Sequence, residues 1–227
     1  MATKTFRFKH SKRIQQSMLA GIEKRVLIWL AERMPAWVTS DHLTVLGFAA
    51  MILTGASFWA ARWDKLGLLL AIFWLAVNWF GDSLDGTLAR VRQRLRPRYG
   101  FYVDHIVDAF GTAALFGGMA LSGYLGWPVA AVLLVVYFML CIEIYLATYT
   151  IGDFHLDYAG FGPTELRIVI AAGNLALYNG FETVNVMGHR YRLFDVGGVV
   201  AALGMAMVLV YASLRHTIQL FREERLP

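Results

Sequence analysis

Residues 81–110 read GDSLDGTLARVRQRLRPRYGFYVDHIVDAF, and long apolar runs precede and follow them. Four aspartates lie in this stretch: Asp82, Asp85, Asp104 and Asp108. A carboxylate next to hydrocarbon costs roughly 2.5–3.5 kcal/mol on insertion scales. Four of them together therefore indicate a function, and the usual ones are metal binding, proton transfer or substrate binding.

The spacing of the aspartates places them in two pairs. Asp82 and Asp85 are three residues apart, and Asp104 and Asp108 are four apart. Residues at these spacings lie on one face of a helix, one turn from each other. We therefore expect two helices that each present two carboxylates on one face.

Small residues lie beside both pairs. Gly86 and Ala89 continue the first face, and Gly100 precedes the second pair by one turn. Without bulk at these positions a ligand can approach the backbone closely. Two such helices facing each other form a cage of carboxylate oxygens that suits Mg²⁺ or Mn²⁺, and no Cys or His cluster here favours zinc. A structural cluster paired with the nearby arginines is the alternative, but it would not require these small residues.

The complete pattern specifies eight positions: Asp82-x2-Asp85-Gly86-x2-Ala89-Arg90-x9-Gly100-x3-Asp104-x3-Asp108. It resembles the signature of the CDP-alcohol phosphotransferases, which are integral-membrane enzymes of phospholipid synthesis. All eight positions match, and the nine-residue gap lies within the range that the family tolerates.

The resemblance implies a reaction and roles for the four acids. A CDP-linked substrate is attacked by an acceptor hydroxyl, which gives a phosphodiester and CMP. Two divalent ions, Mg²⁺ or Mn²⁺, are expected in such a site. By resemblance Asp82, Asp85 and Asp104 are metal ligands, and Asp108 is the base that takes the acceptor proton while also contacting metal.

The resemblance also implies a site for the cytidine nucleotide, which includes Thr44, Gly86, Ala89, Arg90 and Gly100. Thr44 begins a Thr-x2-Gly segment that family members often carry, although Ser-Asp stands before it where Pro-Asn is usual. Arg90 would neutralise phosphate or support an aspartate. Marking the cytoplasmic side of the membrane is the alternative for Arg90.

Composition indicates a membrane protein. The chain has 227 residues, of which 58% are hydrophobic, and its mean hydropathy is +0.52. These values fit one polytopic membrane domain better than a soluble one. A single cysteine excludes a disulfide framework. In such a protein the net charge of +5 indicates orientation and contact with anionic lipid, and we expect no nucleic-acid partner.

We expect an all-α fold with about six transmembrane helices. An N-terminal juxtamembrane segment, residues 1–34, precedes a transmembrane domain at 35–227. Within the segment, apolar residues recur every three or four positions from 11 to 34 among many charges, which predicts an amphipathic helix in the membrane interface. Packing on a soluble partner is its alternative. The expected spans are approximately 40–63, 66–90, 100–121, 128–151, 163–179 and 196–220.

The arginines between the two aspartate pairs predict the orientation. Five of the nine residues from Arg90 to Arg98 are arginine, which is typical of a cytoplasmic loop. The acids would then lie near the cytoplasmic surface, both termini would be cytoplasmic, and residues 182–195 would form an outer loop. We expect the bacterial inner membrane as the location, and by resemblance a homodimer.

Other polar residues in apolar surroundings are candidates for the acceptor site or for support. Arg167 would bind an acceptor phosphate, together with Glu165 and Arg98, while neutralisation of Arg167 by Glu165 is the alternative. Asn78 lies one turn from Asp82 and either supports a metal ligand or makes an interhelical hydrogen bond. Glu143 is the deepest acid and is either functional or the partner of a buried polar group.

The function expected is transfer from a CDP-linked donor in phospholipid biosynthesis. The basic loop and Arg167 favour CDP-diacylglycerol as donor and a small alcohol or alcohol phosphate as acceptor. Transfer from CDP-choline or CDP-ethanolamine to diacylglycerol is the alternative within the family. A divalent-cation transporter and a catalytically inactive membrane scaffold are alternatives from other classes.

Overall fold

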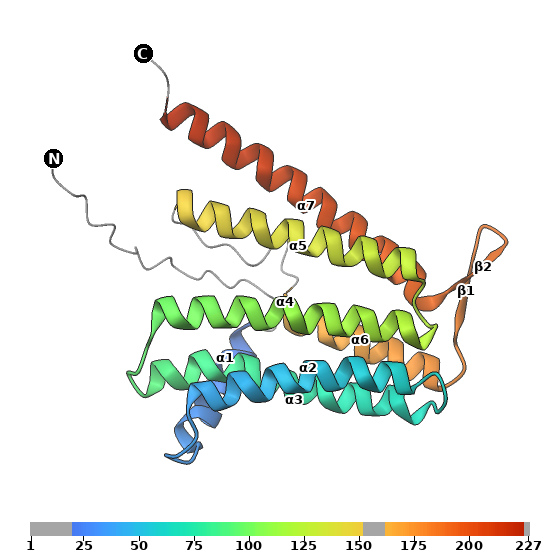
Figure 1. Ribbon diagram of the computed structural model, residues 1–227, viewed down its shortest axis with the longest axis horizontal. Helices are drawn as coiled ribbons and strands as arrows, with labels where there is room; N and C mark the ends of the chain where they lie inside the picture. Colours follow the sequence, from blue (N-terminus) through green and yellow to red (C-terminus); the bar gives the residue numbers. More distant parts are fainter. Residues whose placement is uncertain (1–19, 152–161, 225–227) are drawn as a thin grey trace.

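The computed structural model describes residues 20–151 and 162–224, and these residues form seven helices and one β-hairpin (Figure 1). The elements are α1 (Ala20–Arg33), α2 (Ser40–Ala60), α3 (Leu66–Val91), α4 (Pro97–Ser122), α5 (Trp127–Thr150), α6 (Pro163–Tyr178), β1 (Thr183–Val186), β2 (His189–Arg192) and α7 (Leu193–Glu223). The predicted all-α architecture is confirmed.

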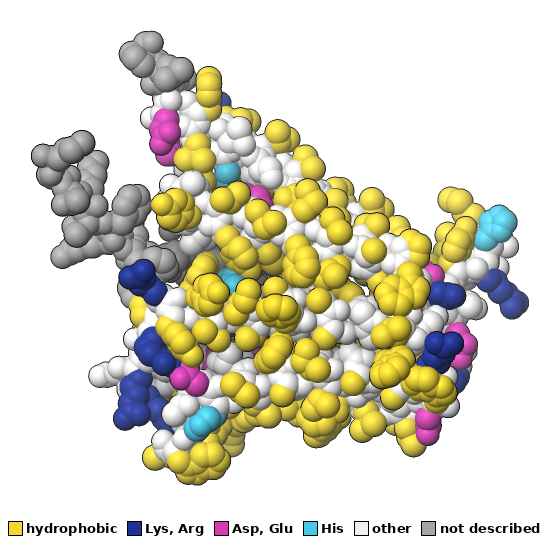
Figure 2. All heavy atoms as spheres, in the orientation of Figure 1, with side chains coloured by type: hydrophobic (Ala, Val, Ile, Leu, Met, Phe, Trp, Pro, Cys, Tyr) yellow, Lys and Arg dark blue, Asp and Glu magenta, His cyan; other side chains and the backbone are white. Residues whose placement is uncertain are grey.

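Five helices in the described part are long and apolar enough to cross a membrane: α2, α3, α4, α5 and α7. Figure 2 shows many hydrophobic side chains over the face in view, with the lysines and arginines mostly at the two ends. Such a surface suits hydrocarbon, so the chain is an integral membrane protein. The helix predicted at 163–179 forms as α6, but its 16 residues span only about 24 Å of a core about 30 Å thick.

The N-terminal amphipathic helix forms over α1 within the described residues, and residues 1–19 lie outside them. Leu27 and Ala31 are buried in a cluster with residues of α2 and α3. Ile22, Val26 and Trp29 are exposed on another side of the helix. Helix α1 therefore packs on the bundle with one face and leaves an apolar face for the membrane interface.

Helix α2 packs against both α3 and α4 (Figure 1). Glycines allow this close approach: a Cβ on Gly118 of α4 would lie 2.6 Å from the Cα of Gly55 in α2. A Cβ on the neighbouring Gly117 would meet nothing within 4 Å among the described residues. The separation of α2 from α4 is thus set by backbone contact at Gly118.

We expect Gly118→Ala to lower the thermal unfolding midpoint of the detergent-solubilised protein. The added methyl must push two backbones apart, and overpacking costs about 1–3 kcal/mol. Gly117→Ala is the matched control, and its midpoint should stay unchanged or rise because alanine favours the helix. Equal midpoints for the two variants would contradict this account of the α2–α4 contact.

The predicted outer loop at 182–195 contains the hairpin β1–β2. Its turn, Met187-Gly188, has positive φ at both residues, as a two-residue hairpin turn of type I′ requires. Glu182, just before β1, forms an ion pair with Lys65 at 2.7 Å and so connects the hairpin to the loop between α2 and α3. These strands were not predicted, because the segment is short and mostly polar.

Candidate active site

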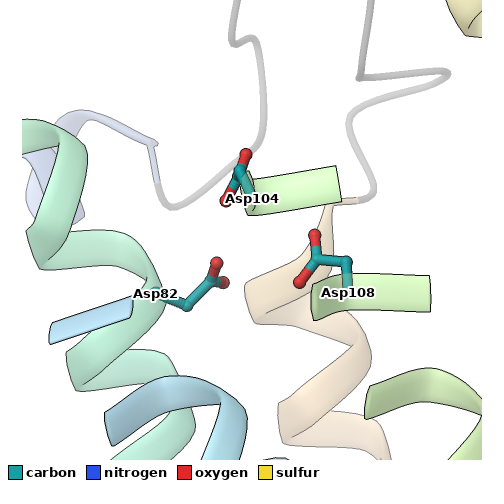
Figure 3. Close-up of side chains that lie close together, drawn as sticks. All are labelled: Asp82, Asp104 and Asp108. Carbon is teal, nitrogen blue, oxygen red and sulfur yellow. The ribbon is translucent and has the colours of Figure 1, made fainter. Parts of the chain in front are cut away.

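Three aspartates from two helices converge in the structure. Asp82 of α3 points toward Asp104 and Asp108 of α4 (Figure 3). One carboxylate oxygen of each residue lies within 4.8 Å of the others, and all three side chains are partly buried. The two faces predicted from the spacing therefore meet.

Backbone contact between α2 and α3 fixes the position of Asp82. A Cβ on the preceding Gly81 would lie 2.6 Å from the backbone nitrogen of Gly47, so no other residue fits there without movement. Asn78, one turn away, donates a hydrogen bond of 2.9 Å from Nδ2 to the Gly47 carbonyl oxygen. Asn78 thus makes the interhelical hydrogen bond that was one of its two interpretations.

The fourth aspartate lines the same pocket but faces α2. The Thr44 hydroxyl donates a hydrogen bond of 2.6 Å to Asp85 Oδ2. Thr44 is held near the beginning of α2, where Thr39 and His42 form a capping box. One pocket is lined by Thr44 and all four aspartates, with Gly47, Phe48, Met51, Asn78, Val107 and Gly111.

This donor set fits a hard divalent cation. Three carboxylates this close repel one another unless a cation or a proton lies among them. All the converging atoms are carboxylate oxygens, which Mg²⁺ and Mn²⁺ prefer, and neither Cys nor His belongs to the group. The residues that could hold the ion are Asp82, Asp104 and Asp108, with Asp85 beside them in the pocket.

An arginine from α6 completes the polar surroundings. Arg167 donates from its terminal nitrogen to Asp82 Oδ2 at 2.5 Å and from Nε to Asn78 Oδ1 at 2.8 Å. Glu165 accepts a hydrogen bond from the Gly162 backbone at the beginning of α6. Arg167 is therefore aimed at an active-site carboxylate, a contact that joins residues 85 positions apart.

The remaining predicted residues are not part of the pocket lining. Gly86 and Ala89 are on the last turns of α3, and Gly100 is on the first turn of α4; none of the three lines the pocket. A Cβ on Gly86 or Gly100 would meet nothing within 4 Å among the described residues. Arg90 donates to the Thr87 hydroxyl at 3.0 Å, and Arg98 is exposed.

A buried acid that the sequence analysis missed lies nearby. Glu23 of α1 accepts hydrogen bonds from Trp79, Ser83 and Thr164. Its position four residues before the buried Leu27 was the available signal, because such residues share a helix face. Helix α1 also has an exposed apolar side, with Ile22, Val26 and Trp29, and the sequence pattern was interpreted from that side alone.

Glu143 also has a partner. Its Oε1 lies 2.6 Å from His216 Nδ1, which joins α5 to α7. Both side chains are mostly buried. Of the two interpretations of Glu143, the structure favours pairing with a buried polar group.

Known proteins with similar sequences belong to the family whose signature the aspartates resemble. The model of the CDP-alcohol phosphatidyltransferase family matches residues 37–216. An archaetidylinositol phosphate synthase of Pyrococcus horikoshii is 30% identical over 131 residues, which cover 58% of this chain and 62% of the relative. A phosphatidylinositol phosphate synthase of Cutibacterium acnes is 35% identical over 86 residues, which cover 38% of this chain and 39% of the relative. The family match spans most of the chain and includes every aspartate of the pocket, so the protein belongs to the CDP-alcohol phosphatidyltransferase family.

Proposed function

We propose that this protein transfers a substituted phosphate group from a CDP-linked donor to an acceptor hydroxyl and releases CMP. The observation that carries the proposal is the convergence of Asp82, Asp104 and Asp108, from two helices, in one pocket of a protein of this family. The acceptor oxygen bonds to the phosphorus that carries the donor's alcohol group. The bond from that phosphorus to the bridging oxygen breaks, and CMP leaves.

In this proposal the aspartates divide the work. Asp82, Asp85 and Asp104 would hold Mg²⁺ or Mn²⁺, as two ions, and Asp108 would both contact metal and take the proton from the acceptor hydroxyl. When bound, the ions neutralise the pyrophosphate charge. A partly buried carboxylate such as Asp108 needs a fixed position to act as a base, and α4 supplies it.

The nucleotide is proposed to lie between the aspartate pocket and the cytoplasmic ends of the two helices, which are the C-terminal end of α3 and the N-terminal end of α4. Thr44 reaches this region from α2 through its hydrogen bond to Asp85. The space beside Gly86 and Gly100 leaves room for a ligand near the backbone, with Ala89 and Arg90 on the adjoining turn.

We propose CDP-diacylglycerol as donor and an alcohol phosphate as acceptor. Arg167 supports an acceptor with phosphate, because a guanidinium can bind phosphate oxygens and this one is hydrogen-bonded to Asp82 of the pocket. The names of both relatives describe synthases of inositol phosphate lipids, which supports the same acceptor class. Glu165 and Arg98 are proposed as further acceptor contacts.

The proposed setting is the bacterial inner membrane, with the aspartates near the cytoplasmic surface. The arginine-rich segment between α3 and α4 lies at the aspartate end of both helices, in agreement with the positive-inside rule. We also propose that both termini are cytoplasmic and that the protein forms a homodimer. Its two parts are the juxtamembrane segment, residues 1–34, and the transmembrane domain, residues 35–227.

A two-arm assay tests the reaction and the donor together. Purified protein in detergent with Mg²⁺ or Mn²⁺ receives CDP-diacylglycerol with inositol phosphate, glycerol phosphate, inositol or serine in one arm. The other arm offers CDP-choline or CDP-ethanolamine with diacylglycerol. We expect CMP only in the first arm. CMP only in the second arm would overturn the proposed donor, and folded protein without CMP in either arm would favour an inactive scaffold or a transporter.

Arg167→Gln should selectively weaken the binding of acceptors that carry a phosphate group. We expect the KM for an alcohol phosphate to rise about tenfold to a hundredfold, since a charged hydrogen-bonded contact contributes about 1.5–3 kcal/mol. An acceptor without phosphate should be affected much less. The matched control is Arg62→Gln, which replaces an exposed arginine at the far end of α2. Equal losses for both acceptor types would exclude phosphate binding by Arg167.

A further inference from the structure

One carboxylate oxygen connects three helices beside the pocket. Glu23 of α1 is 8% exposed, and its Oε1 accepts from Trp79 Nε1 at 2.8 Å and from the Ser83 hydroxyl at 3.3 Å, both on α3. The same oxygen accepts from the Thr164 hydroxyl of α6 at 2.8 Å. Helix α1 is thereby hydrogen-bonded to both α3 and α6.

Burial of a carboxylate costs folding free energy, which suggests that Glu23 has a function besides packing. The three donors are neutral, and Glu23 Oε2 is buried without a hydrogen-bond partner among the described residues. A buried carboxylate without a cation is destabilising relative to an apolar residue of similar size. An amphipathic helix can lie on a membrane without any buried acid. Among the described residues, the contacts of Glu23 therefore do more to connect α1, α3 and α6 than to neutralise its charge.

The partners of Glu23 are next to the residues of the pocket. Ser83 follows Asp82 directly in the chain, and Thr164 lies three residues before Arg167, one turn away on α6. Arg167 in turn binds Asp82. The contacts form a closed ring, from Glu23 through α6 to Arg167, across to Asp82, and back through α3.

We propose that Glu23 is a positioning residue for the acceptor: it holds the first turn of α6 against α3, so that Arg167 faces the pocket. The inference rests on the proposed function. Because Ile22 and Val26 of the same helix are exposed for the membrane interface, Glu23 also couples the membrane-bound helix to the acceptor side of the site.

Kinetics with both substrates test this role. Glu23→Ala should raise the acceptor KM about tenfold and change the donor KM less than about twofold. Glu23→Gln keeps an acceptor oxygen and should restore most of the affinity. Thr164→Val should act in the same direction, and its combination with Glu23→Ala should be no worse than Glu23→Ala alone, since both break one connection.

The control is Glu32→Gln, which changes an exposed acid of the same helix and should leave both KM values unchanged. A parallel loss of donor affinity, acceptor affinity and thermal midpoint in Glu23→Ala would indicate a merely structural role and overturn the inference. If Glu23→Ala does not fold, Thr164→Val decides: an unchanged acceptor KM in that variant overturns the inference as well.

A distance measurement separates this inference from the proposed function. Spin labels replace the exposed Val26 on α1 and Val169 on α6, in a Cys141→Ala background. We expect Glu23→Ala to broaden the distribution of distances between the labels and Glu32→Gln to leave it narrow. An unchanged distribution in Glu23→Ala contradicts the inference whatever the activity, whereas a wild type that releases no CMP contradicts only the proposed function.

Discussion

Asp108→Asn should lower CMP release by about 10³-fold while the protein stays folded. Asparagine has the same shape as aspartate, but it can neither take a proton from the acceptor hydroxyl nor supply a negative charge to an ion. General-base catalysis alone contributes about 10²–10⁴-fold. The measurement is the initial rate of CMP release by purified wild type and variant at saturating donor and acceptor.

Asp64→Asn provides the matched control. Asp64 lies between α2 and α3 at the end of the bundle away from the pocket, where it accepts a hydrogen bond from the Leu66 backbone that asparagine can also accept. We expect wild-type rates for this variant. An Asp108→Asn enzyme with more than about a tenth of the wild-type rate would exclude Asp108 as the base.

Removal of divalent ions should abolish the reaction altogether. Three carboxylates with oxygens within 4.8 Å cannot bind a negatively charged pyrophosphate without a cation between them. We expect EDTA to reduce CMP release to background, and excess Mg²⁺ or Mn²⁺ to restore it. Ion binding should also raise the thermal midpoint, by the equivalent of about 2.7 kcal/mol when the ion is at a hundred times its Kd.

The rise in the thermal midpoint on ion binding tests the metal site without measuring enzyme activity. Asp104→Asn should remove most of the rise in the midpoint with Mn²⁺, and Asp64→Asn should keep it. CMP release that persists in EDTA would contradict the metal site. A midpoint that responds equally to Mn²⁺ in wild type and Asp104→Asn would place the bound ion elsewhere.

The sequence predicted the helices and the aspartate pairs because both depend on local spacing. Apolar runs long enough to cross a membrane predict helices without reference to the rest of the chain. The spacing of Asp82 to Asp85 and of Asp104 to Asp108 depends only on helix periodicity. Acids are costly to expose to hydrocarbon, so the acidic faces of α3 and α4 are both expected to turn toward the interior of the bundle. This explains why the two faces meet at one pocket.

Contacts between distant segments could not be predicted in the same way. The pairing of Arg167 with Asp82 joins residues 85 positions apart, and the bond from Thr164 to Glu23 joins residues 141 apart. No periodicity encodes which side of α6 meets α3. The sequence identified Arg167 as a candidate phosphate ligand, but only the fold shows that it is held against an aspartate.

Two other differences have local causes. Helix α6 matches the predicted 163–179 to within one residue, but its 16 residues are short for a membrane span. It ends at Tyr178, before the Asn179-Gly180 turn, where Gly180 has positive φ. The apolar periodicity from 11 to 34 predicts one apolar side, which includes Ile22, Val26 and Trp29 of α1, but not the buried face with Glu23.

The most direct test of the account is the stoichiometry of the reaction. Purified protein is given CDP-diacylglycerol, Mg²⁺ and an alcohol phosphate, and CMP and phosphodiester lipid are both quantified by mass spectrometry. The proposed transfer predicts one phosphodiester lipid for each CMP, and no CMP when the acceptor is left out. CMP released without an acceptor would indicate hydrolysis, and no CMP at all from folded protein would contradict transferase activity at the aspartate pocket.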